Sequence, residues 1–249
     1  HPASRDSSTS RGLGDVYKRQ TRVPLMVRWP KRIPSARRVE DFVSIMDIGP
    51  TLLELSKVEV PSTMDGRSFL NKLTSKKSGW IDRNWDSVII GRELHFHNSR
   101  PGNMPYPMRA VRTKDYLYIR NFKPKRWPMG NPYDSAKLNM PDDLYKMGLS
   151  TKPAYRDLDG SLTKAWMMSR REEPIDKELF RLTMYPRPCE ELYDIVNDPD
   201  QLVNLATEPK FSSVVTSLRA RVEQVMNNSN DPRIKDAFDR LPWVDSTKP

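Results

Sequence analysis

Short apolar runs and alternating apolar and polar positions predict β-strands along the chain. Residues 23–27 form an apolar run between Arg22 and Arg28, which is typical of a buried strand. Four further β-rich segments predict strands over residues 87–91, 108–113, 116–121 and 191–195. Only Lys114 and Asp115 separate the second of these segments from the third, so the two are expected to form an antiparallel hairpin.

Helical spacing predicts three helices. Within residues 39–58, Asp47 can cap a helix and Pro50 suits its first turn. A short helix is expected near residues 162–171. The clearest helix lies near the C-terminus, where apolar side chains recur at Phe211, Val214, Val215, Leu218, Val222 and Val225.

Polar and proline-rich stretches predict the connections. Residues 72–82 are polar and are expected to form a surface connection between two subdomains, and residues 122–187 predict long ordered loops. Residues 1–20 have no apolar periodicity and resemble a translated sequencing adapter, so they are expected to be non-native and disordered.

Charge and cysteine content narrow the function classes. The 249-residue chain has a net charge of +10, and 38 basic residues against 30 acidic ones remain without residues 1–20. A basic chain favours anionic partners. A single cysteine, Cys189, excludes an internal disulfide and a cysteine-based zinc ribbon. The sequence has no long apolar run, phosphate loop, zinc-finger spacing or basic recognition helix, so we expect neither a membrane nor a nucleic acid as partner.

The densest candidate chemistry follows the strand predicted at residues 87–91. Arg92 and Arg100 carry planar donors that suit sulfate, phosphate or carboxylate groups, and His95 and His97 can donate to an anion or carry a proton. Two histidines at this spacing share a face of an extended chain, so a metal site is possible, although no third ligand lies nearby in the sequence. The segment therefore predicts an anion or substrate site, a metal site or only a solvated polar loop.

Three other segments carry weaker signals. Residues 157–161 resemble a calcium loop but lack its glutamate at the twelfth position, so a turn is expected. Cys189 has no neighbouring base in the sequence, which argues against a nucleophile. Residues 123–128 are basic and aromatic, so they could bind a polyanion, a sugar or a base, or pack a tryptophan beneath a proline-rich loop.

Several segments, in their order and spacing, resemble the sulfatase family. The segments similar to the latter part of sulfatases in general are residues 21–30, 43–53 and 65–70. The segments similar to the heparan N-sulfatase (sulfamidase) branch and its bacterial relatives are residues 91–100, 106–113, 118–122, 126–128, 191–194, 198–199 and 204–206. The resemblance extends over about residues 21–243.

The resemblance implies an α/β fold similar to alkaline phosphatase, of which this chain would hold the C-terminal part. Residues 21–76 would form the end of the large α/β domain. Residues 77–249 would form a smaller α+β subdomain, with an antiparallel sheet and a C-terminal helix.

The resemblance also implies hydrolysis of sulfate esters or sulfamates of carbohydrates. In the family a formylglycine, made from the cysteine of a Cys-x-Pro-Ser-Arg motif, lies beside a calcium ion. Cys189 is followed by Glu190 and Glu191 instead. The resemblance therefore implies that this chain provides neither the nucleophile nor the calcium ligands, binds no cofactor itself and is inactive without a missing N-terminal half.

On the same resemblance, the chain would bind a sulfated carbohydrate through Arg92, His95, His97 and Arg100, with Arg109 as a further candidate. Family members are typically periplasmic or secreted. The alternative interpretation, which the basic charge supports, is a non-catalytic module that binds sulfated or other polyanions.

Overall fold

The computed structural model describes residues 23–133, 141–235 and 239. The chain forms two compact units, one of residues 24–88 and 112–114 and one of residues 89–111 and the described residues from 115 onward.

The smaller unit contains three short helical segments. They are η3 at Ile45–Asp47, α2 at Ile48–Leu55 and α3 at Leu70–Thr74. Asp47 precedes α2, and its carboxylate accepts hydrogen bonds from the backbone N–H groups of Ser44 and Arg67, both at 2.8 Å. The helix predicted within residues 39–58 is confirmed. The predicted cap is wrong, because the Asp47 carboxylate accepts no hydrogen bond from the first turn of α2 and instead ties the start of the helix to a segment 20 residues later.

The strand predicted at residues 23–27 is wrong. The segment is irregular and has no backbone hydrogen bond to another described residue. Its side chains are exposed, to 92% at Met26 and 50% at Leu25. A buried strand needs a paired neighbour and covered faces, and an apolar run in the sequence provides neither by itself.

Residues 72–82 lie within the smaller unit, and residues 76–78 are exposed, as predicted for a polar surface segment, whereas its first residue is not. Lys72 belongs to α3 and is only 2% exposed, and its Nζ donates to Asp82 Oδ2 at 3.1 Å. The same Nζ lies 3.9 Å from the ring centroid of Trp85, which is a cation–π contact. Pairing with a carboxylate and an aromatic ring allows this lysine to be buried.

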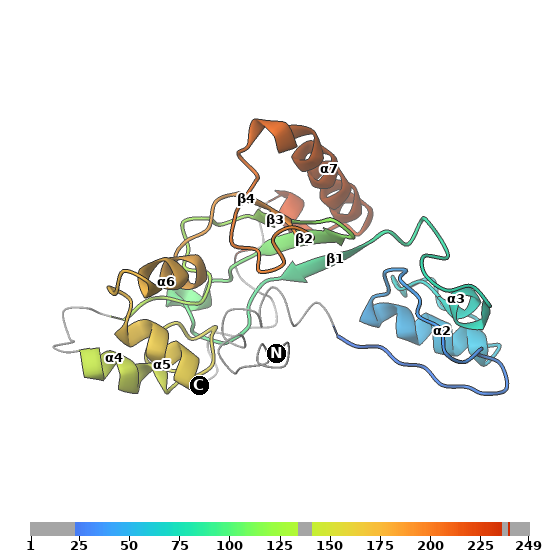
Figure 1. The fold of residues 1–249 in the computed structure, drawn as a ribbon, viewed down its shortest axis with the longest axis horizontal. Coiled ribbons are helices and arrows are strands. Elements are labelled where there is room, and N and C mark those ends of the chain that lie inside the picture. Colours follow the sequence, from blue (N-terminus) through green and yellow to red (C-terminus); the bar gives the residue numbers. More distant parts are fainter. Residues whose placement is uncertain (1–22, 134–140, 236–238, 240–249) are drawn as a thin grey trace. The chain divides into compact units, whose positions relative to one another are not determined.

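The larger unit contains most of a four-stranded sheet in the order β1-β2-β3-β4 (Figure 1). The strands are β1 at Ser87–Arg92, β2 at Met108–Thr113, β3 at Tyr116–Asn121 and β4 at Glu190–Asp194. Strands β3 and β4 are antiparallel, with Tyr118 opposite Leu192. These four strands, and the two-residue connection between β2 and β3, are confirmed.

Helix α7, at Ser212–Asn228, covers one face of this sheet (Figure 1). Its buried residues are Val215, Leu218, Val222 and Met226. They pack with Val111, Tyr118 and Leu192, whereas the adjacent strand residues Ala110, Leu117 and Tyr193 belong to a cluster on the opposite face. The predicted antiparallel sheet with a C-terminal helix is confirmed, as expected for an α+β subdomain.

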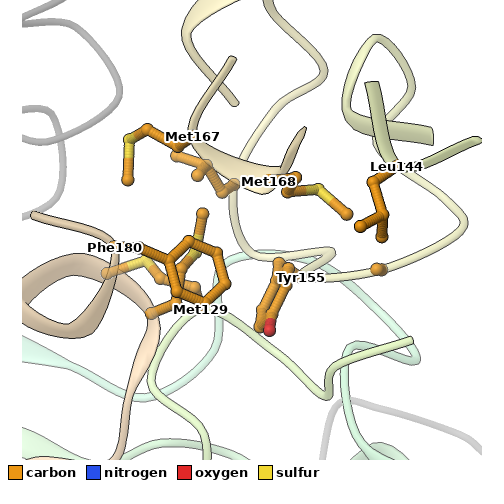
Figure 2. Close-up of a cluster of buried hydrophobic side chains, with 9 residues drawn as sticks. Met129, Leu144, Tyr155, Met167, Met168 and Phe180 are labelled. Carbon is orange, nitrogen blue, oxygen red and sulfur yellow. The ribbon is translucent and has the colours of Figure 1, made fainter. Parts of the chain in front are cut away.

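Three helices lie within residues 122–187, where long loops and one short helix are predicted. They are α4 at Pro141–Gly148, α5 at Leu162–Ser169 and α6 at Asp176–Met184. Helix α5 confirms the predicted short helix, whereas α4 and α6 have no counterpart in the prediction. Figure 2 shows their shared core, which contains Met129, Leu144, Tyr155, Met167, Met168 and Phe180. Methionine adapts to irregular spaces, so short helices with little apolar periodicity still bury a core here.

Candidate functional site

The loop between β1 and β2 comprises residues 93–107. Residues 95–98 are exposed, and residues 99–100 and 105–107 are buried. Ser99 and Arg100 are only 2% and 4% exposed, whereas His95 and His97 are exposed. The flanking strands fix where the loop begins and ends, and the exposed part remains accessible to a ligand.

One carboxylate, that of Asp157, anchors the first half of this loop. Its Oδ1 accepts hydrogen bonds from the Phe96 N–H at 2.9 Å and from the Ser99 hydroxyl at 2.7 Å. Its Oδ2 accepts a hydrogen bond from Arg100 Nη2 at 2.6 Å and lies 3.1 Å from Arg92 Nη2. The Asp157 side chain is 0% exposed, and these four protein groups hold the loop against it.

The surroundings of Asp157 keep it charged. Burial by itself raises the pKa of the Asp157 carboxyl, but Arg100, Arg92 and the hydrogen bonds from Ser99 and Phe96 together lower that pKa below its usual range. One negative charge therefore faces two guanidinium groups, and this cluster has an excess positive charge.

The two arginines that share Asp157 differ in how their donors are used. Arg100 donates from Nε to Trp127 O at 2.8 Å, from Nη1 to Met104 O at 3.2 Å and from Nη2 to Pro128 O at 2.8 Å. Its side chain is 2% exposed. The guanidinium of Arg100 is thus satisfied on every nitrogen by the protein itself.

Arg92 is less buried than Arg100 and has fewer partners. Its side chain is 11% exposed, and its contacts are made by Nη2, with Asp157 and with Pro128 O at 3.5 Å. Its buried Nε and Nη1 have no hydrogen-bond partner among the described residues. Buried donors without partners are rare in proteins, and they are typical of a position that a ligand or an ordered water completes.

A second ionic cluster holds Arg109 and the start of the loop. Arg109 donates to Glu93 Oε1 at 2.8 Å and to the two carboxylate oxygens of Asp231 at 2.5 and 3.0 Å. Arg233, in η7 at Pro232–Lys235, has a side chain that is 0% exposed and donates to Glu93 Oε2 at 2.6 Å. This cluster joins β1 and β2 to the segment that follows α7.

Gly130 allows two segments to approach each other next to Asp157. Its φ is +89°, and a Cβ at this position would lie 2.8 Å from Arg156 N and 3.0 Å from Ser99 O. The adjacent Met129 O accepts a hydrogen bond from the Asp157 N–H at 3.0 Å. Only glycine suits both the backbone angle and the close approach, so this position helps to place Asp157 against the loop.

The basic and aromatic residues 123–128 fit the packed alternative at the tryptophan. The Trp127 ring contacts the rings of Tyr155 and Tyr185, with centroid distances of 6.0 and 5.2 Å. Lys125 of the same segment is exposed. Cys189 is exposed and immediately precedes β4. The observed turn, at residues 156–157, overlaps the turn predicted over residues 157–161 only at Asp157.

The structure brings together some of the predicted site residues. Arg92 and Arg100 meet on Asp157, Arg109 lies in the other cluster, and His95 and His97 are exposed. Within the described ranges, no group of three or more His, Cys, Asp or Glu side chains could hold a metal ion. The sequence analysis missed the role of Asp157, because its neighbours in the sequence indicate only a turn.

Comparisons with known proteins identify the class. The chain is 26% identical over 197 residues to an ulvan-active sulfatase of Formosa agariphila, which covers 79% of the chain and 31% of that protein. It is also 26% identical over 235 residues to human N-sulphoglucosamine sulphohydrolase, which covers 89% of the chain and 39% of that protein. The solved structure of BT4656 in complex with its substrate D-glucosamine-2-N,6-O-disulfate is 17% identical, with a TM-score of 0.49, and the match covers 84% of this chain and 29% of that chain.

These curated relatives are sulfatases. The family model described as N-sulphoglucosamine sulphohydrolase, C-terminal, matches residues 15–164, and the chain belongs to this family. The resemblance found in the sequence is thereby confirmed. The chain spans about a third of the length of the curated relatives it matches.

Proposed function

We propose that this chain supplies the substrate-binding side of a sulfatase active site and binds the sulfate or sulfamate group of a carbohydrate through Arg92. The observation that carries the proposal is the half-used guanidinium of Arg92, whose buried Nε and Nη1 are unpaired among the described residues. The family to which the chain belongs supports the proposed reaction class, since the curated relatives are sulfatases.

Physical chemistry favours an anion at Arg92. A buried donor without a partner destabilises the protein by about 1–3 kcal/mol. Nε and Nη1 of Arg92 are enclosed among the described residues, so a sulfate oxygen would supply the missing acceptor once the loop gives access to them. Hydrogen bonds between a guanidinium and an anion are stronger than neutral ones. Since Asp157 balances only one of two arginines, the excess positive charge of the cluster also favours an anionic ligand.

The other candidate residues have different parts in this proposal. His95 and His97 are exposed on the loop and would donate to the sugar or its sulfate. Arg100 and Arg109 already bind protein groups, so they would contribute by holding the loop and by their charge. Such fixed donors and charges suit the stabilisation of negative charge as an S–O or S–N bond breaks.

The nucleophile and the metal of the family do not fit the described residues. Cys189 is not followed by Pro-Ser-Arg, and the described part of the chain offers no cluster of three metal-ligating side chains. We therefore assign to this chain the binding and orientation of substrate, and the proposal leaves formylglycine, calcium and bond cleavage to another part of the protein.

We also propose that residues 21–76 belong to the α/β domain of the sulfatase and residues 77–249 to its C-terminal subdomain. The described residues of the first segment expose large apolar side chains, including Met26 at 92%, Ile45 at 69% and Met46 at 59%. An exposed apolar group of this kind is typical of a surface that another part of a protein covers.

The location of the protein stays a prediction, periplasmic or secreted. In the described part of the chain, no helix has the length and apolarity needed to cross a membrane.

A binding titration tests the proposal. N-sulfoglucosamine is titrated into the 249-residue chain, and amide chemical shifts are followed by NMR. We expect shifts at the β1–β2 loop, and we expect Arg92→Met to weaken binding about 10- to 150-fold, which corresponds to a charged hydrogen bond of about 1.5–3 kcal/mol. Lys125→Ala, at an exposed lysine outside the loop, is the control and should change the affinity little.

Two results would contradict the proposal. The first is equal affinity for N-sulfoglucosamine and N-acetylglucosamine, because the sulfate would then make no contact. The second is an equal loss of affinity for Arg92→Met and Lys125→Ala, accompanied by a steep decrease with salt. That pattern would favour the non-catalytic polyanion-binding module, since dispersed surface charges are screened by salt.

A further inference from the structure

Lys164, in α5, has a buried ammonium group whose hydrogen-bond partners are all backbone carbonyls. The residue is 0% exposed. Its Nζ donates to Ala154 O at 2.7 Å, Leu158 O at 3.0 Å, Ser150 O at 3.2 Å and Tyr155 O at 3.3 Å. Rings of carbonyl oxygens also hold monovalent cations in proteins, in place of their water. The ammonium of Lys164 thus occupies a carbonyl cage that is suited to a small cation.

The ammonium form persists in this cage at neutral pH. Burial lowers the pKa of Lys164 to about 8, against an opposing effect of Asp159. No salt bridge to a carboxylate accompanies this lysine among the described residues, so the four carbonyls are the groups that replace its water.

All four carbonyls belong to the segment from Ser150 to Leu158, which also carries Asp157. Tyr155 in this segment has a φ of +46°, a left-handed conformation that is unfavourable for a tyrosine. Figure 2 shows its ring within the core shared by the helices. Without a cation, the converging carbonyl dipoles would repel one another, so this backbone shape depends on the charge at its centre.

We propose that Lys164 is a positioning residue, an internal cation that shapes the segment from Ser150 to Leu158 and thereby places the Asp157 carboxylate against Arg92 and the β1–β2 loop. The effect passes from Lys164 to the carbonyls, from the segment to Asp157, and from Asp157 to the Phe96 N–H and Arg92. A further step, from the position of Arg92 to the binding of a sugar, rests on the proposed function, and the steps before it do not.

Amide hydrogen exchange of the 249-residue chain at pH 7 tests the proposal without a substrate. Lys164→Met keeps the apolar stem and removes the charge. We expect the Phe96 amide to exchange at least about 10-fold faster, because its acceptor Asp157 is no longer held, and the Val222 amide in α7 to keep its protection. Lys146→Met, at an exposed lysine of α4, is the matched control and should leave both amides unchanged.

A chemical rescue separates the charge from the packing of the side chain. Lys164→Ala removes the part of the side chain that n-propylammonium would replace. We expect n-propylammonium chloride to restore the protection of Phe96 in this variant, and tetramethylammonium chloride, which has no N–H donor, to leave it unprotected. If Lys164→Met unfolds as a whole, recovery of the folded Lys164→Ala variant by n-propylammonium alone supports the proposal, and the absence of recovery overturns it.

An unchanged Phe96 amide in a folded Lys164→Met variant would also overturn the proposal. Titration with N-sulfoglucosamine adds the functional step, with weaker binding expected for Lys164→Ala and recovery expected with n-propylammonium. If the unmodified chain does not bind this sugar, the proposed function fails, while the exchange and rescue results still decide the role of Lys164.

Discussion

The two ionic clusters that hold the β1–β2 loop each contain a largely buried arginine, Arg92 or Arg109, and the two arginines use their donors differently. Arg92 and Arg109 have side chains that are 11% and 12% exposed. Arg109 reaches two carboxylates and two backbone carbonyls, whereas Arg92 shares one carboxylate with Arg100 and leaves two nitrogens unpaired among the described residues. Burial alone does not distinguish a structural arginine from one that awaits a ligand, and the use of its donors does.

The same comparison explains why the two clusters should respond differently to substitution. At the Asp157 end, one carboxylate carries two arginines and two further donors. In the Arg109 cluster, Glu93 and Asp231 both pair with Arg109, and Glu93 also pairs with Arg233. Removing one group should therefore have a large effect at the first cluster and a smaller one at the second.

The largest effect is expected for Asp157→Asn. Loss of the charge leaves two buried guanidinium groups without a counter-ion, which should lower the free energy of unfolding by about 3–5 kcal/mol. Asp231→Asn should lower it by only about 1–2 kcal/mol, because Arg109 keeps Glu93. Denaturant unfolding measures both, with Asp143→Asn, at an exposed aspartate of α4, as control. Equal losses for the two variants would contradict the difference between the clusters.

For the arginines, the losses of unfolding free energy are expected to be smaller, and the larger loss is expected in the Arg109 cluster. Arg109→Met should lower the free energy of unfolding by about 2–3 kcal/mol, since it leaves Asp231 without its guanidinium. Arg92→Met should change it by less than about 1 kcal/mol, because it removes a partly paired group and leaves Arg100 on Asp157. Thermal unfolding of the two variants checks the order, and a larger loss for Arg92→Met would show that its donors are satisfied in the protein.

The smallest expected effect is a change in how the free energy of unfolding depends on pH under acidic conditions. Since the pKa of Asp157 is lower in the folded chain than in the unfolded one, its contribution to stability is complete above the unfolded pKa and is lost as the pH falls toward the folded pKa. Below about pH 4, the unmodified chain should therefore lose more stability per pH unit than Asp157→Asn does. Urea unfolding at a series of acidic pH values measures both slopes, and parallel slopes would show that the Asp157 pKa does not differ between the states.

The sheet and α7 could be predicted from the sequence because their signals are local. Alternation at residues 116–119 and helical spacing from Val215 to Val222 follow directly from how side chains meet a covered face. Residues 23–27 show the limit of this approach. Their apolar run is the same in the sequence whether or not a neighbouring strand exists, so it could not predict the exposed, irregular segment that the structure has.

The sequence was sufficient to locate the candidate loop but not to predict which contacts each of its residues makes. Arg92 and Arg100 look equivalent in the sequence. In the structure, the carbonyls of Met104 and Trp127 accept hydrogen bonds from Arg100 alone, and Pro128 O lies closer to Arg100 than to Arg92. Likewise, the short-range pattern around Asp157 indicates a turn, while the loop residues that donate hydrogen bonds to its carboxylate lie 57 to 61 residues earlier. Such partners depend on the tertiary fold, and single-sequence periodicity carries no information about them.

The contact between Glu93 and Arg233 has a consequence for the order of folding. The two residues are 140 positions apart, and the intervening chain includes β2, β3, the three helices, β4 and α7. During synthesis from the N-terminus, the loop can acquire its Asp157 anchor well before its Arg233 anchor exists. The Glu93–Arg233 ion pair can therefore form only after Arg233 has been made, and until then Arg109 is the nearer arginine that pairs with Glu93.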